Sequence, residues 1–130
     1  MAFSILVVDD NRLMRGMVAR SVTLSGLPVS SLHEAGDGEQ ALALLRRQWV
    51  DLVLLDINMP VMDGETFLGQ VRADARLRAT LVVVVSTESS QPRIARLKAL
   101  GAGFIHKPFT PESLVKAVQD LMAIGSGGAP

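Results

Sequence analysis

The chain has 130 residues, and its contents of 48% hydrophobic and 20% charged residues are ordinary for a soluble globular protein. It has no cysteine, which excludes disulfides, zinc-thiolate sites and thiol catalysis. Thirteen basic residues balance thirteen acidic ones, so no overall charge draws the protein toward nucleic acid or an anionic membrane.

Short apolar runs alternate along the chain with longer segments of helical periodicity. Strands are expected at residues 3–8, 29–34, 52–55, 81–85 and 103–106. The first, third and fourth of these are nearly continuous runs of branched apolar residues. Such runs are typical of parallel strands that are covered on both faces of a sheet.

Amphipathic helices are expected between and after these strands, at residues 13–24, 40–49, 65–72, 92–100 and 111–122. Gly26 ends the first helix, and Thr110 is a natural N-cap for the last, with Pro111 at its first position. Five strand–helix units predict a doubly wound α/β fold. We expect one domain over residues 1–124 and a flexible Gly/Ser-rich tail over 125–130.

Polar residues follow four of the predicted strands. The strands at 3–8, 52–55, 81–85 and 103–106 are followed by Asp9-Asp10, Asp56, Ser86-Thr87 and Lys107. In an open parallel sheet, ligands bind at the carboxyl ends of the strands. We therefore expect three carboxylates, one or two hydroxyls and one ammonium at a single edge.

This combination of groups suits phosphoryl transfer. Clustered carboxylates repel one another and favour a hard cation, and Mg²⁺ suits such a site because it takes few protein ligands. A carboxylate beside Mg²⁺ can attack a phosphoryl group and form an aspartyl-phosphate. Mg²⁺ and the Lys107 ammonium would neutralise the phosphoryl oxygens, and the Ser86 hydroxyl would donate to one of them.

Each of these residues taken alone also has an ordinary structural explanation. Asp10 can cap the first helix, and Asp56 can simply begin a loop. Lys107 can be a solvated surface lysine, and Ser86-Thr87 can form a turn before a helix. Their convergence at the ends of four strands of one sheet favours a functional site.

Three sequence blocks carry a family resemblance. They are Val7-Val8-Asp9-Asp10-Asn11, Asp56-Ile57-Asn58-Met59-Pro60-Val61-Met62-Asp63-Gly64 and Lys107-Pro108-Phe109. Together, with Ser86-Thr87 between the second and third, they closely resemble the response-regulator receiver domain, most strongly its single-domain chemotaxis type. The resemblance covers roughly residues 3–123. It implies a flavodoxin-like fold, a five-stranded parallel sheet in the order 2-1-3-4-5 flanked by five helices.

The resemblance assigns the phosphorylation chemistry to matching positions. Asp56 corresponds to the phosphoacceptor, with Ser86 and Lys107 as the groups that bind the phosphoryl oxygens. The implied Mg²⁺ site consists of Asp10 and Asp56 as direct ligands, Asp9 acting through a water molecule, and the backbone carbonyl of Asn58.

The resemblance also assigns the switch and the signal lifetime. Ser86 and Phe104 correspond to the switch pair, which changes the surface made by the fourth helix, fifth strand and fifth helix. Asn58 and Glu88 correspond to positions that tune hydrolysis and imply an aspartyl-phosphate lifetime of minutes or less. The segment from Gly101 to the lysine is one residue shorter than is usual in the family.

The implied function is that of a two-component response regulator. It takes a phosphoryl group from a sensor histidine kinase or a phosphotransfer protein and then binds an output protein, which the sequence does not identify. Such a protein catalyses only its own phosphorylation and autodephosphorylation, and is otherwise not an enzyme. We expect a cytoplasmic monomer without DNA or membrane binding, and a phosphorylation-dependent dimer is the alternative state.

Two other functions remain as alternatives. Phosphohydrolases with an aspartate nucleophile usually carry a second acid two residues later, where Asn11 stands if Asp9 is the nucleophile. A receiver-like interaction module that is never phosphorylated is expected to have lost Asp56, an acidic neighbour or Lys107. All of these are present.

Overall fold

The computed structural model describes residues 2–57, 59, 61–87 and 90–127, with side chains placed as far as residue 123. The described residues form a parallel sheet of β1 (Phe3–Val8), β2 (Val29–Ala35), β3 (Leu52–Leu55), β4 (Leu81–Ser86) and β5 (Gly103–His106). The strand order is β2-β1-β3-β4-β5, and each neighbouring pair is parallel. The predicted doubly wound fold is confirmed, with β2 and β4 each ending one residue later than expected.

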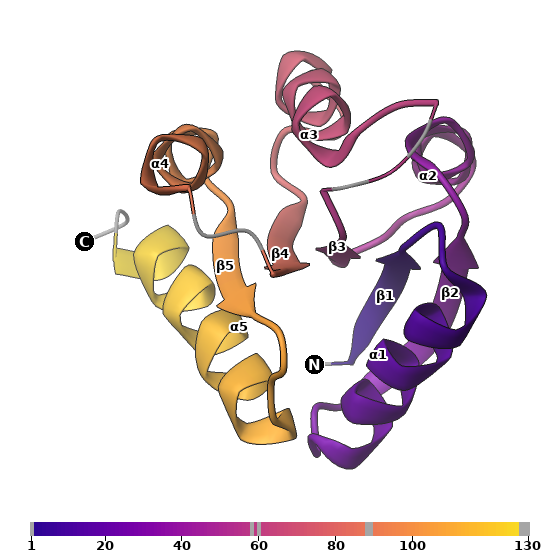
Figure 1. Ribbon diagram of the computed structural model, residues 1–130, viewed down its shortest axis with the longest axis vertical. Helices are drawn as coiled ribbons and strands as arrows, with labels where there is room; N and C mark the ends of the chain where they lie inside the picture. The colour runs from indigo at the N-terminus through magenta and orange to yellow at the C-terminus, as the bar shows by residue number, and fades with distance from the viewer. Residues whose placement is uncertain (1, 58, 60, 88–89, 128–130) are drawn as a thin grey trace.

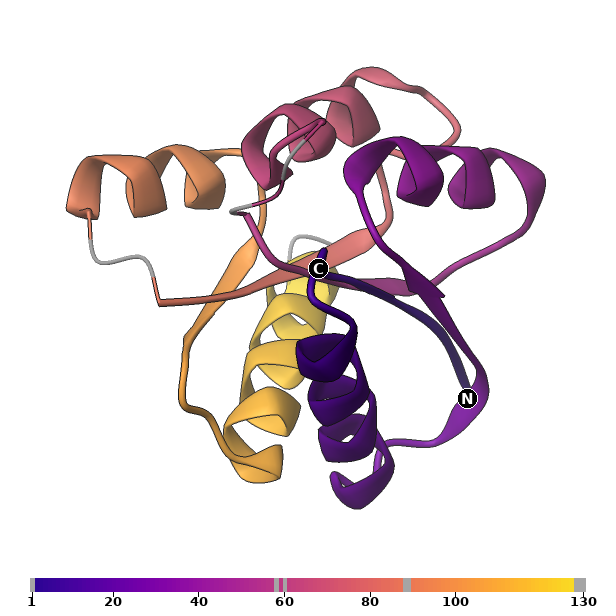
Figure 2. The same cartoon turned by 45° about the vertical axis from the view of Figure 1, so that its right-hand side comes forward.

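A helix follows each strand of the sheet (Figure 1). The helices are α1 (Arg12–Leu24), α2 (Gly38–Arg47), α3 (Gly64–Ala73), α4 (Gln91–Ala99) and α5 (Pro111–Gly127). Figure 2 shows α1 and α5 on one face of the sheet and α2, α3 and α4 on the other. None of the helices in the described part of the chain has both the length and the apolar character that crossing a membrane requires.

Two helices, α2 and α5, end more than one residue away from their predicted ends. The second helix was expected over 40–49 but ends at Arg47, because Gln48 takes an extended backbone with φ −152°. Trp49 is therefore outside the helix, and its side chain is 70% exposed. The backbone of α5 continues to Gly127, into the segment 125–130 whose composition predicts a flexible tail.

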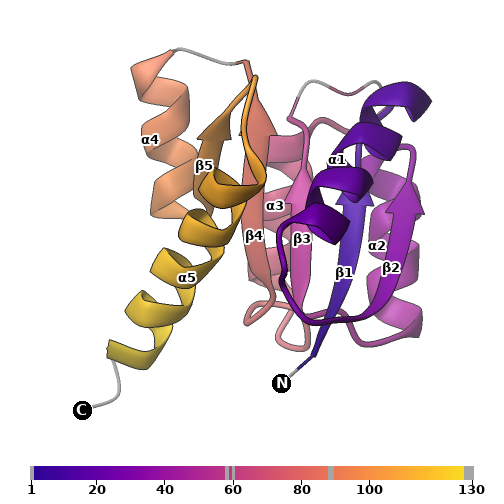
Figure 3. The same cartoon turned by 90° about the horizontal axis from the view of Figure 1, so that it is seen from below.

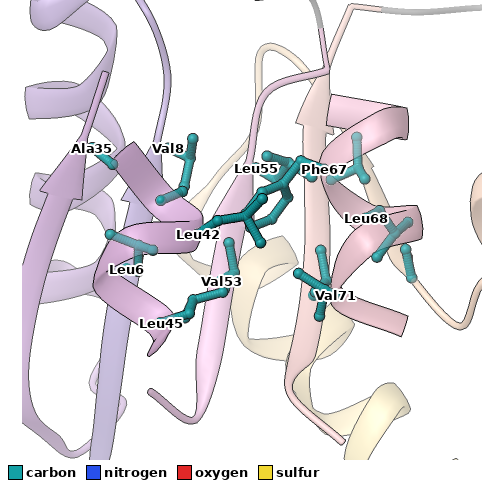
Figure 4. Packing of buried hydrophobic residues seen from close by; sticks show 14 of the residues in the cluster. Leu6, Val8, Ala35, Leu42, Leu45, Val53, Leu55, Phe67, Leu68 and Val71 are labelled. Atoms are coloured by element: carbon teal, nitrogen blue, oxygen red, sulfur yellow. The ribbon is translucent and has the colours of Figure 1, made fainter. Parts of the chain in front are cut away.

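Alternate side chains of the central strands enter two hydrophobic clusters, one on each face of the sheet. In β1, Leu6 and Val8 belong to the cluster beneath α2 and α3, whereas Ile5 and Val7 belong to the cluster beneath α1 and α5. Figure 4 shows the first cluster, where the Phe67 ring of α3 packs among the strand side chains. Each such buried side chain contributes about 1.5–3 kcal/mol relative to exposure, so the sheet is a rigid support for its edge.

The register of the strands determines which residues lie at the carboxyl edge of the sheet. Val8 of β1 lies opposite Leu55 of β3, which lies opposite Val84 of β4. Asp9 and Asp56, which follow β1 and β3, therefore leave the sheet at the same level, and β4 continues past that level for two residues, to Ser86. In Figure 3 the strands point toward this common edge, where the loops after β1, β3 and β4 emerge.

Gly64 begins α3 in close contact with the loop that follows β3. Its N–H donates to the carbonyl of Ile57 at 3.0 Å. A Cβ atom at this position would lie 2.5 Å from Ile57 Cα and 2.9 Å from the carbonyl oxygen of Asp56. No side chain fits there without displacing that backbone, so glycine lets α3 pack directly on the loop that holds Asp56.

We predict that Gly64→Ala lowers the free energy of unfolding by about 1–3 kcal/mol, because the added methyl overpacks against backbone. Gly69→Ala is the matched control on the same helix, since a Cβ there meets nothing within 4 Å. That control is expected to raise stability by about 0.5–1 kcal/mol, the usual difference between glycine and alanine inside a helix. Urea unfolding measures both, and equal effects of the two substitutions would contradict the packing argument.

Candidate functional site

Three carboxylates meet at the edge formed by β1 and β3. Asp9 and Asp10 follow β1, and Asp56 follows β3, with its N–H donating to the carbonyl of Val8 at 2.9 Å. One carboxylate oxygen from each aspartate lies within 4.8 Å of the other two. Asp9 is buried, Asp56 is partly buried and Asp10 is exposed. The structure thus brings together the three acidic residues that the strand-end pattern singled out.

Asp9 is held on both carboxylate oxygens. Its Oδ1 accepts from the N–H of Asn11 at 2.9 Å. Its Oδ2 lies 3.5 Å from Nζ of Lys107, and the two side chains are only 4% and 15% exposed. Loss of one partner of such a buried pair leaves an uncompensated charge, which is strongly destabilising. Lys107 therefore neutralises the deepest of the three carboxylates.

The positions of Ser86 and Lys107 follow from the pairing of β4 with β5. Ser86 is the last residue of β4 and is fully buried, and its carbonyl accepts from the N–H of Lys107 at 2.9 Å. Thr87, the other hydroxyl in this segment, is exposed. The ends of β4 and β5 are thus joined directly beside the acidic edge.

Phe104 lies on β5 opposite Val84, three residues before Lys107. Its partly buried ring packs against the core cluster beneath α2 and α3. The ring also contacts that of His106 edge-on, with ring centroids 4.7 Å apart and planes at 64°. The short segment before Lys107 is therefore accommodated with β5 beginning directly at Gly103.

Two sequence predictions at this site concern residues that the structure does not describe. Asn58, expected to offer a carbonyl to Mg²⁺ and to tune hydrolysis, lies outside the described residues, as does Glu88.

The start of α3 closes the loop after Asp56. The carboxylate of Asp63 caps the helix by accepting from the N–H of Thr66 at 2.8 Å. This hydrogen bond lowers the pKa of Asp63, so the cap stays ionised at neutral pH. Two residues before the cap, Val61 has φ 67°, and its side chain is 77% exposed. A β-branched residue in this left-handed region is strained.

Arg15 is a residue of the site that the sequence analysis did not single out. Its Nη1 donates to the backbone carbonyl of Asp9 at 2.8 Å, and its Nε pairs with Glu34 at 3.1 Å. The sequence could have pointed to Arg15 through its position on α1. Residues 15, 18 and 22 share one helical face, and the latter two are buried valines. An arginine on the inward face of a helix calls for a partner inside the structure.

An apolar groove of about 840 Å³ runs along the exposed edge of β5 between α4 and α5. Its lining includes the Phe104, Phe109 and Leu121 side chains, with Lys98 of α4 and Lys116 of α5 at its sides. Figure 3 shows α4 and α5 diverging on either side of this strand. The groove therefore adjoins both Phe104 and the strand that ends at Lys107.

Comparisons with known proteins agree with this arrangement. The family model of the response regulator receiver domain matches residues 5–119. The chain is 35% identical over 125 residues to a chemotaxis protein CheY homolog of Campylobacter jejuni, with 95% of each chain covered. It is 37% identical over 111 residues to the chemotaxis protein CheY-3 of Vibrio cholerae, with 85% of this chain and 84% of that one covered. The solved structure of the Vibrio cholerae chemotaxis protein CheY4 aligns with a TM-score of 0.81 at 34% identity, over 93% of this chain and 99% of that one.

We predict that Val61→Asn raises the free energy of unfolding by about 1 kcal/mol, because asparagine tolerates the left-handed backbone that strains a β-branched side chain. Val61→Ile is the matched control, since it keeps the branching at Cβ and should leave stability nearly unchanged. Chemical denaturation compares the two. Equal stability of the asparagine and isoleucine variants would show that Val61 is not strained.

Proposed function

Because the chain belongs to the response regulator receiver family of two-component signalling, we propose that Asp56 accepts a phosphoryl group and thereby changes a surface that binds an output protein. The observation that carries this proposal is the convergence of Asp9, Asp10 and Asp56 at one sheet edge, with their oxygens within 4.8 Å. The Lys107 ammonium lies at the same edge, 3.5 Å from Asp9.

The donor set fits Mg²⁺. Three carboxylates so close together repel one another, and oxygen ligands of this kind suit a hard divalent cation. We assign Asp9, Asp10 and Asp56 as its side-chain ligands, with the backbone carbonyl of Asn58 as the further ligand that the family resemblance implies. When bound, Mg²⁺ supplies positive charge that offsets the charge on the phosphoryl oxygens.

In the proposed reaction, a carboxylate oxygen of Asp56 attacks the phosphorus of the donor. A bond forms between that oxygen and phosphorus, while the bond from phosphorus to the leaving group breaks and its electron pair leaves with the donor. The partly buried position of Asp56 leaves it accessible to a donor. Lys107 then interacts with the phosphoryl oxygens as a compact point charge, and the Ser86 hydroxyl donates to another of them.

The output proposed here is a change in the groove along β5. Phosphorylation replaces the single negative charge of the Asp56 carboxylate with an acyl phosphate of about −1.5 to −2, and Ser86 moves toward the phosphoryl group. Phe104, whose side chain lines the groove, then turns inward into the space that Ser86 leaves. Its contact with His106 at 4.7 Å is lost, so the groove between α4 and α5 changes shape for a partner.

The rest of the proposal follows the family. Residues 1–124 make up the receiver domain, and residues 125–130 form a tail whose first three residues continue α5. The phosphoryl group comes from a sensor histidine kinase or a phosphotransfer protein, in the cytoplasm. The names of its CheY relatives support a role in chemotaxis-type signalling. We further propose that the protein acts as a monomer and catalyses only its own phosphorylation and autodephosphorylation.

The test is incubation with acetyl phosphate and Mg²⁺, followed by intact mass. Wild type is expected to gain one phosphoryl group, and Asp56→Asn is expected to gain none. Asp74→Asn is the matched control, because Asp74 lies at the opposite end of α3 and caps a turn through Arg76. EDTA should abolish labelling of wild type.

Equal labelling of wild type and Asp56→Asn would refute the assignment, and turnover of a phosphate monoester would favour a phosphohydrolase instead.

The labelled sample also tests the proposed switch and the proposed lifetime of the phosphoryl group. The amide signals of Phe104 and His106 should shift on labelling, and the label should decay within minutes after removal of acetyl phosphate. Persistence for many hours would contradict the roles given to Asn58 and Glu88.

A further inference from the structure

Arg15 joins the end of β1 to the end of β2. Its side chain is 17% exposed, although it lies only one turn into α1. Nη1 donates to the carbonyl oxygen of Asp9 at 2.8 Å, and Nε donates to Oε1 of Glu34 at 3.1 Å. Glu34 is the penultimate residue of β2 and is paired with Val7 of β1. The guanidinium thus contacts the turn after β1 and the strand β2 from the helix that covers both strands.

The carbonyl that Arg15 holds belongs to the peptide bond between Asp9 and Asp10. A peptide unit is planar, so fixing its oxygen also fixes the direction in which Asp10 leaves the strand. The side chain of Asp9 is fixed separately, by the N–H of Asn11 at 2.9 Å and by Lys107 at 3.5 Å. Asp10 is exposed, and the backbone that precedes it is therefore what Arg15 restrains.

Such a restraint matters because the three carboxylates repel one another. Their mutual Coulomb energy favours any rotation of the turn that carries the exposed Asp10 away from Asp9 and Asp56. A turn that is already fixed in the convergent arrangement loses less free energy when a cation binds. The ion pair with Glu34 also offsets the charge of Arg15, so the guanidinium restrains the turn with little net positive charge near the site.

We propose that Arg15, oriented by Glu34, is a positioning residue for the cation site, setting the affinity for Mg²⁺ by fixing the peptide between Asp9 and Asp10. The inference rests on the proposed function, because it assumes that these carboxylates hold Mg²⁺. It assigns Arg15 no contact with the cation or with the phosphoryl group.

Two physical effects of removing Arg15 have opposite signs, which makes the proposal testable. If the guanidinium acted only as a nearby positive charge, Arg15→Met would strengthen Mg²⁺ binding. If it acts by positioning, the same substitution weakens binding. Loss of groups that orient metal ligands typically costs about 10–100-fold in affinity, and we expect about tenfold here.

The experiment is calorimetric titration of the unphosphorylated full chain with MgCl₂. Arg15→Met should raise the Kd for Mg²⁺ about tenfold. Arg15→Lys keeps the charge but cannot make both contacts at once, so it should restore part of the affinity. Arg12→Met is the matched control, because it removes an exposed arginine from the first turn of the same helix. Its Kd should stay within about twofold of wild type or fall slightly.

Thermal unfolding in EDTA accompanies each titration, so that a loss of fold is not mistaken for a loss of affinity. A lower melting temperature with an unchanged Kd for both Arg15 variants would overturn the proposal and leave a purely structural ion pair. Tighter binding by Arg15→Met would also overturn it. Wild type that binds no Mg²⁺ would reject the proposed cation site itself, whereas binding by wild type with no effect of Arg15 would reject only this inference.

Discussion

Repulsion among three carboxylates at one edge of the sheet is the constraint on which the rest of this site depends. Asp9, Asp10 and Asp56 place their oxygens within 4.8 Å of one another, a distance at which like charges repel. One of the three is compensated by Lys107 inside the structure. The remaining negative charge is the feature on which the proposed binding of a divalent cation at this edge rests.

The surrounding backbone is arranged to withstand that repulsion. The N–H of Asp56 is tied to the carbonyl of Val8, so β1 and β3 cannot separate at their ends without losing a sheet hydrogen bond. Because Gly64 has no side chain, the first turn of α3 packs directly against Ile57. On the other face of the sheet, Arg15 donates a hydrogen bond to the carbonyl of Asp9. These supports come from both layers of helices, which explains why the site requires the whole sheet rather than one loop.

Much of this arrangement could be predicted from local patterns. Apolar runs indicated the strands, and the polar residues directly after them indicated the functional edge of the sheet. Both were predictable because hydrophobic periodicity and strand ends depend on residues that are close together in the sequence. The strand order rested on the family resemblance. The end of α2 was predicted two residues too late, because the extended backbone of Gln48 has no strong local signal.

The contacts of Arg15 could not be predicted in the same way. Its partners lie in the turn after β1 and on β2, and the pairing with Glu34 spans 19 residues, so it depends on how α1 packs across two strands. The left-handed backbone of Val61 was equally hidden, because a β-branched residue is a poor indicator of that conformation. Both features depend on tertiary structure and on the conformation that the loop takes once the sheet has formed.

The most direct test of the central claim compares the unfolding free energy of wild type and Asp10→Asn with and without Mg²⁺. Relief of repulsion should make Asp10→Asn more stable than wild type in EDTA, by about 1 kcal/mol. Saturating Mg²⁺ should then stabilise wild type by linkage and the variant far less. A variant that is less stable than wild type in EDTA, together with no effect of Mg²⁺ on either protein, would contradict the account.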